Sequence, residues 1–388
     1  MKDVYDLVLI GGGVSSCTLI FNLLKNGFKG RIGVVEAGRG LGGRCSTRRR
    51  QNKENLAINH GSPIFNITNT LKNPLLNSFI SQLLENNLIK KSENSFYEVD
   101  NSFNLSNLTY KHNYNFYFGN VYQPNILMSE LLENLVSFYN SNDQIDFYFK
   151  KLIVKLNYEN NIWRISSNKD FEIFGKLLIS SSNLILHKRS LNILNVNHIP
   201  LIDALKNSNN TYIDEIISLT NNQEYIKRVN FIIYPKSNFY MDGIFDKDNI
   251  HFIFNNNLEK NIGIERIIFQ KQIDNTFCIV VHTKNREIFQ KEIIKDDNKF
   301  LYEYLFKNLD KILKRNSVST RNFSIDDISI MNWRASQPIG KAIPARLQFC
   351  KDYKIGFCGD WFEFEGYGTV QGAFISALTL SEKISKFI

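Results

Sequence analysis

Three consecutive glycines, Gly11 to Gly13, are the first residues of the chain suited to binding a ligand. They follow a short apolar run, Tyr5 to Ile10, and precede a segment, Val14 to Leu24, in which apolar residues recur at helical spacing. Such glycines permit a tight turn and let the backbone approach a pyrophosphate, which the free N–H groups of a helix start attract. Glu36, at the end of the next apolar run, could accept hydrogen bonds from a ribose diol. The pattern predicts a Rossmann-type dinucleotide-binding unit, with the small Ser16 in place of the usual third glycine.

Glycines and arginines also crowd the segment that follows Glu36. It contains Leu-Gly-Gly-Arg from Leu41 to Arg44 and continues as Cys-Ser-Thr-Arg to Arg48. The two glycines again let the backbone approach a ligand, and Arg44 could hold phosphate oxygens through charge-assisted hydrogen bonds. On its own the segment could be a generic basic loop. A second motif near the carboxyl end of the chain favours the ligand interpretation.

That second motif is again a strand, a turn and a helix. A strand-like run, Lys354 to Phe357, leads to Gly359-Asp360, and a glycine-rich turn then precedes an apolar helix that starts near Val370 and includes Gly372 and Ala373. Asp360 alone could be an ordinary turn residue or a helix N-cap. Its place between a strand end and a helix start favours a ligand-binding role, because a helix start stabilises negative charge.

These segments resemble the flavin-dependent amine oxidase superfamily and, within it, the renalase family. Asn59 to Phe65 (Asn-His-Gly-Ser-Pro-Ile-Phe) is similar to that family's Asp-His-Gly-Ala-Gln-Tyr-Phe segment. Trp333 to Pro338 is similar to its Trp-Arg-Tyr-Ala-Gln-Pro segment, and Gly359 to Trp361 and Val370 to Phe374 match as well. The resemblance covers the chain up to Phe65 and from about residue 329 onward.

The resemblance implies one non-covalently bound FAD. In such proteins the Leu-Gly-Gly-Arg loop crosses the FAD pyrophosphate, the Gly-Asp pair binds the ribityl chain, and the last helix faces the flavin N1–C2=O edge. The backbone near Val154 is expected to meet the adenine, although a plain hairpin core is the alternative there. The expected cofactor-binding residues are Gly11, Gly13, Val14, Ser15, Ser16, Glu36, Ala37, Gly42, Gly43, Arg44, His60, Gly61, Val154, Gly359, Asp360, Val370, Gly372 and Ala373.

Few residues suggest themselves as catalytic, and hydride transfer to a flavin needs no obligatory side-chain base. His60 is the one titratable residue expected beside the ring, although a lone histidine is more often structural. Trp333 and Tyr367 are the expected aromatic residues of the substrate cavity. Departures from the family pattern put the substrate in doubt; they are Asn59, Ser62-Pro63, Ile64 and Ala335.

The pattern of elements predicts an α/β (α+β overall) fold, in which a Rossmann-type FAD-binding domain carries an inserted substrate domain with a mixed β-sheet. The FAD-binding domain is expected to comprise residues 1–70, 115–185 and 329–388, and the substrate domain residues 71–114 and 186–328. Helices are expected at about 75–88, 126–139 and 299–313, and strands at 145–149, 152–158, 162–166, 171–174, 176–180, 229–234, 251–254 and 276–282.

Composition indicates which classes of protein the chain does not belong to. The chain has 388 residues, of which 43% are hydrophobic and 22% charged, as in ordinary globular proteins. No apolar run is long enough for a membrane helix, and no signal peptide is evident. The five scattered cysteines predict neither a disulfide framework nor a metal site and fit a cytoplasmic protein. The net charge of +9 is spread along the chain, so we expect no nucleic-acid partner, and nothing indicates an obligate protein partner.

The sequence therefore predicts an FAD-dependent oxidoreductase that transfers a hydride from a small molecule to flavin N5, with O2 as a plausible acceptor. The renalase resemblance implies a dihydronicotinamide nucleotide as substrate. A flavin amine oxidase is one alternative. A flavin-binding protein without turnover is the other, because function resides in a site rather than in a fold.

Overall fold

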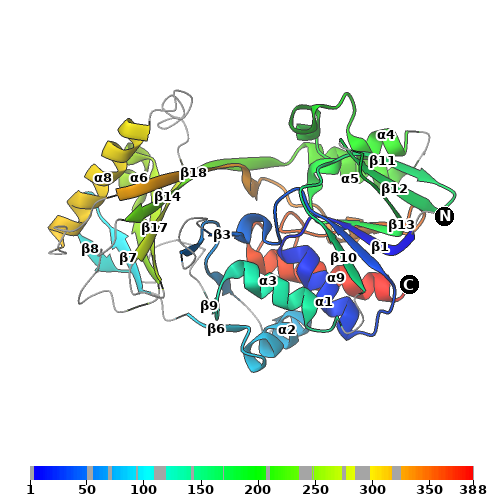
Figure 1. The fold of residues 1–388 in the computed structure, drawn as a ribbon, viewed down its shortest axis with the longest axis horizontal. Coiled ribbons are helices and arrows are strands. Elements are labelled where there is room, and N and C mark those ends of the chain that lie inside the picture. Colours follow the sequence, from blue (N-terminus) through cyan, green and yellow to red (C-terminus); the bar gives the residue numbers. More distant parts are fainter. Residues whose placement is uncertain are drawn as a thin grey trace.

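The computed structural model describes residues 4–387 apart from 50–55, 69–71, 93–94, 109–118, 141–143, 169, 207–209, 236–246, 248, 273–276, 285–297 and 317–324. Two large sheets dominate these residues and lie at opposite ends of an elongated molecule (Figure 1). Both chain termini lie at the end that holds the first sheet.

The first sheet has eight strands, and most of them are parallel. Its main path is β10(Ile145–Tyr148), β2(Ile32–Val35), β1(Val4–Ile10), β13(Glu172–Ser180), β12(Ile162–Ser167) and β11(Ile153–Glu159), with β20(Ile355–Phe357) beside β13 and β19(Phe349–Cys350) beside β20. Strands β10, β2, β1, β13 and β20 run in the same direction. Their carboxyl ends therefore meet at one edge of the sheet, where open α/β sheets bind ligands.

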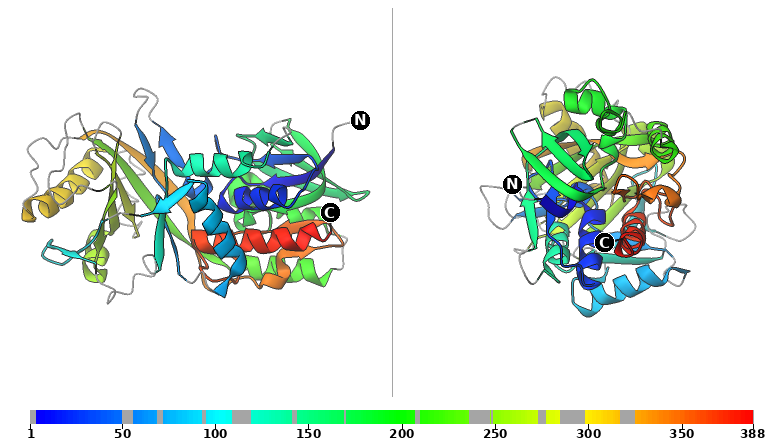
Figure 2. Two further views of the ribbon diagram at one scale, coloured as in Figure 1. Left: turned by 90° about the horizontal axis from the view of Figure 1, so that it is seen from below. Right: turned by 90° about the vertical axis from the view of Figure 1, so that its right-hand side faces the viewer.

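Both faces of this sheet are covered, as a parallel sheet requires. Side chains alternate along β1, so Leu7 and Leu9 enter one core while Val8 and Ile10 enter the other. Helices α1(Val14–Lys25), α2(Pro74–Glu85), α3(Met128–Ser137) and α9(Val370–Ser385) contribute to the first core (Figure 2). Helices α4(Pro200–Ala204) and α5(Thr211–Asn221) contribute to the second.

The second sheet has seven strands in the order β18(Ile325–Ile339), β14(Glu224–Pro235), β17(Phe277–Thr283), β16(Ile264–Lys271), β15(Asn249–Phe254), β7(Ser95–Val99) and β8(Leu105–Asn107). Helix α8(Asn298–Arg315) packs on one face through Leu305, Leu309, Ile312 and Leu313, and α6(Asn256–Ile262) adds Leu258. Strands β14 and β18 form a long two-stranded ladder that reaches from this sheet toward the first one (Figure 1).

Two smaller sheets join the layers. One pairs β3(Thr47–Arg49) with β4(Ala57–Asn59), and the other has the order β5(Phe65–Ile67), β9(Asn120–Pro124) and β6(Ile89–Lys91). Ile58 of β4 packs on the second sheet beside Ile232 and Ile268. The segment that leads to His60 is therefore anchored on the second sheet.

The mixed α/β architecture and the Rossmann-type first sheet confirm the predicted fold class. The two strands expected at 171–174 and 176–180 are one strand, β13, which begins at Glu172 and ends at Ser180. Gly175 does not interrupt it, because this glycine pairs with Tyr5 and leaves room for Val8, which a Cβ atom would approach to 2.6 Å.

The packing also differs from the expected domain boundaries. Helix α2 and strand β6 were assigned to the substrate domain, yet they share a core with α1 and α9. Phe79 of α2 contacts the rings of Phe21 and Phe374, with centroid distances of 5.5 and 5.1 Å. Helices α4 and α5 likewise pack on the first sheet, while residues 329–338, assigned to the FAD-binding domain, lie in β18 of the second sheet.

Candidate functional site

A cavity of about 1160 Å³ lies at the carboxyl edge of the first sheet. This exceeds the roughly 300–1,000 Å³ of common small-molecule pockets and leaves room for an extended dinucleotide. Gly11, Glu36, Ser181 and Gly359 follow the carboxyl ends of four neighbouring parallel strands, and all four line the cavity. Residues of β14 and β18 form the opposite wall. Motifs far apart in the sequence are thus brought together by the order of the strands.

Glycine backbones form the floor of the cavity. Gly13 and Gly42 form a β-bridge, and the Gly42 N–H donates to the carbonyl oxygen of Gly12 at 2.9 Å. A Cβ atom on Gly43 would lie 3.3 Å from the Gly13 Cα atom, and Gly43 has a φ of +54°. Glu36 holds the same turn, because its two carboxylate oxygens accept the N–H groups of Gly12 (2.6 Å) and Gly38 (2.5 Å). Carboxylate oxygens can accept more than one hydrogen bond, so a ribose diol still fits beside Glu36.

Two long helices start at this cavity. Helix α1 begins after Gly13 and α9 after Thr369, and neither N-cap residue provides a side-chain hydrogen bond to the first turn. Val14 and Ser15 of α1, and Val370 and Ala373 of α9, line the cavity. Unsatisfied N–H groups and the helix dipole therefore present two regions of partial positive charge to it.

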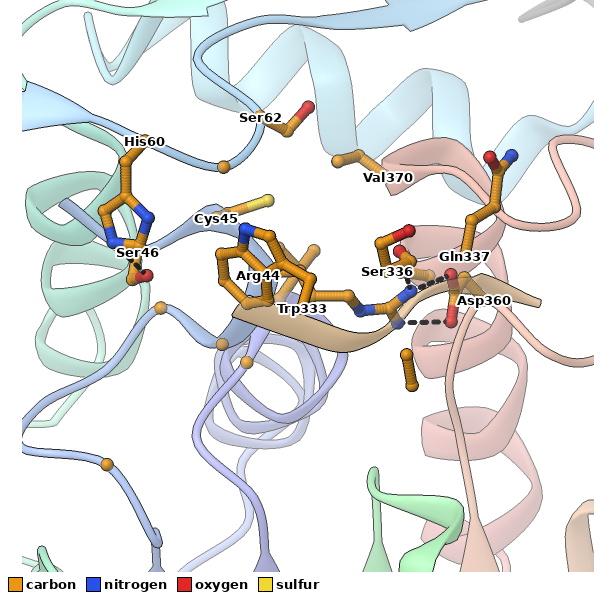
Figure 3. Close-up of a pocket in the computed structure, with 18 of the residues that line it drawn as sticks. Arg44, Cys45, Ser46, His60, Ser62, Trp333, Ser336, Gln337, Asp360 and Val370 are labelled. Atoms are coloured by element: carbon orange, nitrogen blue, oxygen red, sulfur yellow. Dashed lines mark hydrogen bonds and ion pairs between the residues drawn. The ribbon is translucent and has the colours of Figure 1, made fainter. Parts of the chain in front are cut away.

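Arg44 and Asp360 form a bidentate ion pair within the cavity (Figure 3). Arg44 Nη1 donates to Asp360 Oδ2 at 2.7 Å and Nη2 donates to Oδ1 at 2.6 Å, while Nη1 also reaches the carbonyl oxygen of Ser336 at 3.1 Å. The Asp360 side chain is only 5% exposed, whereas Arg44 is 40% exposed. The two residues expected to contact separate parts of one ligand thus contact each other, and Arg44 fixes the orientation of the Asp360 carboxylate.

These features fit FAD. The glycine floor accepts a pyrophosphate at close range, α1 and Arg44 supply positive charge to it, and Asp360 supplies a buried acceptor for a polyol chain. The start of α9 would stabilise negative charge on a ligand group that approached it.

His60 lies on the second-sheet side of the cavity. Its Nε2 atom is 3.0 Å from Ser46 Oγ, and its ring stacks on Trp333 with a centroid distance of 5.6 Å (Figure 3). The carbonyl oxygen of His60 accepts a hydrogen bond from Asn230 at 2.9 Å. Burial, assisted by the charge of Arg48, lowers the pKa of His60 to about 4, so its ring is neutral at neutral pH.

This pKa predicts an acid-sensitive stability. Between about pH 4 and 6.5 the unfolded chain binds a proton on His60 that the folded chain does not, so stability falls as the pH drops through this window and is unaffected by His60 above it. The shift corresponds to roughly 3 kcal/mol. Between pH 7 and pH 4 we expect the free energy of unfolding, measured by chemical denaturation, to fall by about 2–3 kcal/mol less in His60→Gln than in the wild type. The exposed residue His198, changed to glutamine, serves as the control; an equal slope in all three proteins would contradict the prediction.

Asn59 departs from the aspartate of the resembling family but keeps an acceptor role. Its Oδ1 atom accepts hydrogen bonds from Thr47 Oγ1 (2.6 Å) and from the Met128 N–H at the start of α3 (3.1 Å). The backbone of Asn59 pairs with the side chain of Gln270, which accepts its N–H at 3.0 Å and donates to its carbonyl at 2.8 Å. A carboxylate is not needed for these contacts, so the departure is accommodated structurally.

Fifteen of the expected site residues line the cavity, namely Gly11, Gly13, Val14, Ser15, Glu36, Gly42, Gly43, Arg44, His60, Gly61, Gly359, Asp360, Val370, Ala373 and Trp333. Five do not, namely Ser16, Ala37, Val154, Gly372 and Tyr367.

Four of these five lie behind or beside the cavity, and Val154 lies away from it. Ser16 is fully buried and its hydroxyl donates to Ser181 Oγ at 2.9 Å, which fits a packing role. Gly372 faces the Gly366 carbonyl oxygen, which a Cβ atom would approach to 2.4 Å. Ala37 and Tyr367 each adjoin lining residues. Val154 lies on β11 at the far edge of the sheet.

The backbone that adjoins Glu36 precedes β11. The Glu36 N–H donates to the Tyr148 carbonyl at 2.9 Å, and the Lys151 N–H donates to the Glu36 carbonyl at 3.0 Å. The turn after β10 therefore lies beside Glu36, the residue expected to bind the ribose.

Sequence reasoning missed the polar wall that the second sheet contributes. Asn230, His282 and Arg266 are register partners on β14, β17 and β16, and all three line the cavity. Arg266 Nη2 lies 2.8 Å from His282 Nδ1. Arg228, two residues before Asn230, forms a bidentate ion pair with Glu265 at 3.0 Å. The alternation of Arg228 and Asn230 with buried Val229 and Phe231 was the available signal, since it marks a strand with one polar face.

Comparisons with known proteins agree with this geometry. Residues 9–83 match the family model of the NAD(P)-binding Rossmann-like domain. No curated protein sequence matches the chain. Among solved structures, the crystal structure of "Putative protoporphyrinogen oxidase" from Exiguobacterium sp. 255-15 aligns with a TM-score of 0.60 at 11% identity, covering 98% of this chain and 99% of that one. No helix within the described part of the chain is both long and apolar enough to span a bilayer. The chain thus has a Rossmann-like dinucleotide-binding domain within a fold shared with that protein over nearly its whole length.

Proposed function

We propose that the protein is an FAD-dependent oxidoreductase that oxidises a small molecule by hydride transfer. The observation that carries this proposal is that two uncapped helix starts, α1 and α9, open into one cavity over a floor of glycine backbone. The start of α1 suits a diphosphate and the start of α9 suits a flavin edge. Asp360 lies between the end of β20 and the start of α9. The oxidase description of the structural neighbour supports the same reaction class.

The roles of the residues follow from their positions. FAD held in this cavity would supply the redox chemistry for hydride transfer from the substrate, with O2 as the proposed final acceptor. Glu36 would bind the adenosine ribose, and α1 and Arg44 the diphosphate. Asp360 would bind the ribityl chain. We expect the flavin ring beside His60 and Trp333, which stack on each other. The neutral ring of His60 offers no positive charge that would repel a cationic product.

A reduced nicotinamide nucleotide is the substrate that we favour, in line with the resemblance to the renalase family. Its oxidation yields a pyridinium cation and needs no side-chain base. An amine substrate is less well supported, because Tyr367, the expected partner of Trp333 in an aromatic pair, does not line the cavity.

Anaerobic reduction tests the proposal. We expect the purified protein to be yellow and to lose its flavin absorbance when mixed with dihydronicotinamide nucleotide isomers, and to regain it in air. Bleaching by amines or by a porphyrinogen instead would contradict the substrate assignment. A yellow protein that no donor reduces would indicate a flavin-binding protein without turnover, and a colourless protein that does not take up FAD would refute the proposal.

A further inference from the structure

Arg189 is a cationic residue of the cavity that no motif singled out. It follows β13 in a segment that begins at the carboxyl edge of the first sheet, and it lines the cavity together with Ser181, Ser182 and Asn183. Ser181 lies against the glycine turn, because its N–H donates to the Ile10 carbonyl at 3.0 Å. The segment therefore reaches the side of the cavity where α1 begins.

The guanidinium of Arg189 is held by neutral groups alone. Its Nη2 atom donates to Asn183 Oδ1 at 3.0 Å, and its Cζ atom lies 4.0 Å from the centroid of the Tyr225 ring. Within the described ranges, no carboxylate forms an ion pair with it, and its buried Nε atom has no hydrogen-bond partner. A partly buried guanidinium without a carboxylate is costly unless an anion completes its surroundings.

Arg44 is close enough to influence Arg189. Burial lowers the pKa of Arg189, and the charge of Arg44 lowers it further, while Tyr225 acts in the opposite direction. Asp360, the carboxylate in this part of the cavity, is already bound in bidentate fashion to Arg44. Because Asp360 is bound to Arg44, it does not compensate the charge of the Arg189 guanidinium.

We infer that Arg189 is a second arginine ligand of the cofactor diphosphate, in addition to Arg44. The inference rests on the proposed function, since it takes the occupant of the cavity to be FAD. Asn183 and Tyr225 position the planar guanidinium, whose remaining N–H groups can bind phosphate oxygens through charge-assisted hydrogen bonds.

The test compares flavins with and without a diphosphate on the full-length protein. Arg189→Gln is expected to weaken FAD binding by about 10- to 100-fold, the range for a lost charge-assisted hydrogen bond, and to leave riboflavin binding unchanged. Inorganic pyrophosphate should compete with FAD for the wild type and correspondingly less well for the variant. The FAD affinity of Arg189→Lys should lie between those of the wild type and Arg189→Gln, because lysine keeps the charge but lacks the planar guanidinium.

Arg346→Gln is the matched control, since it removes one positive charge from an exposed ion pair with Glu215. It should leave the affinity for both flavins as in the wild type. Equal loss of FAD and riboflavin binding in Arg189→Gln would mean a structural role and overturn the inference. An Arg189→Gln variant with unchanged FAD affinity would also overturn the inference, even if its affinity for a reduced substrate fell. These outcomes differ from failure of the proposed function, in which the wild type itself binds no FAD.

Discussion

Replacement of Asp360 by alanine is expected to yield a colourless protein. The Asp360 side chain is 5% exposed and holds Arg44 through two hydrogen bonds of 2.6 and 2.7 Å. Its removal takes away the buried acceptor proposed for the ribityl chain and leaves the Arg44 guanidinium without its carboxylate. We expect FAD affinity to fall on the order of 100-fold, measured by fluorescence titration of the protein freed of flavin.

The FAD affinity of Asp360→Asn should fall less than that of Asp360→Ala, because asparagine keeps one acceptor oxygen in place. The control is Glu215→Ala, which breaks a bidentate pair with Arg346 on the exposed surface and should leave FAD affinity unchanged. An Asp360→Ala protein that retains FAD with wild-type affinity would contradict both the role of Asp360 and the placement of the ribityl chain.

Gly61→Ala is expected to be the most disruptive single-methyl change in the cavity. A Cβ atom on Gly61 would lie 1.9 Å from the Arg44 carbonyl oxygen and 2.8 Å from its carbon. Both are backbone atoms and cannot move independently, so the segment carrying His60 and the Leu-Gly-Gly-Arg loop must separate. Overpacking of this kind costs about 1–3 kcal/mol or more. We expect the free energy of unfolding to fall by about 3 kcal/mol and the bound flavin to be lost, as measured by chemical denaturation and absorbance.

Gly40→Ala provides the contrast within the same cavity. A Cβ atom there meets nothing within 4 Å, so stability should change by less than about 0.5 kcal/mol and FAD should be retained. Similar effects of the two substitutions would show that the close contact between Gly61 and Arg44 does not constrain the site.

Several parts of the site that the sequence predicted lie next to a strand end. Gly11, Glu36 and Gly359 each follow an apolar run of the right length, and the rule that parallel strands share a carboxyl edge then brings them together. The glycines and Asp360 could be found because local patterns alone defined them.

Residues that long-range pairing places could not be found in this way. Asn230, His282 and Arg266 meet only because three antiparallel strands have one particular register, and no local pattern specifies it. Arg189 follows a strand whose end was predicted, but nothing in the segment indicates which side chain turns into the cavity. Val154 lies on β11, and whether its backbone meets the adenine stays a prediction.

The domain to which helix α2 belongs could not be predicted from the sequence either. The helix itself is predicted by the sequence, but its buried apolar stripe, Leu76, Phe79, Ile80 and Leu83, does not reveal the element that it packs against. The stripe packs on α9, which lies some 300 residues further along the chain, so its domain could be assigned only from the three-dimensional arrangement.

The continuous ladder of β14 and β18 constrains how the cavity can be entered. Its register runs from Glu224 opposite Ile339, beside the first sheet, to the far end of the second sheet, with irregularities only at Ile226–Arg228 and Tyr234–Pro235. Moving the first and second sheets apart would require both strands of the ladder to bend together. A hydrogen-bonded pair of strands resists such bending far more than a single flexible connection does. Exchange of a bound dinucleotide should therefore depend on small loop displacements and be slow, so that the molecule would acquire its cofactor while folding and keep it through purification.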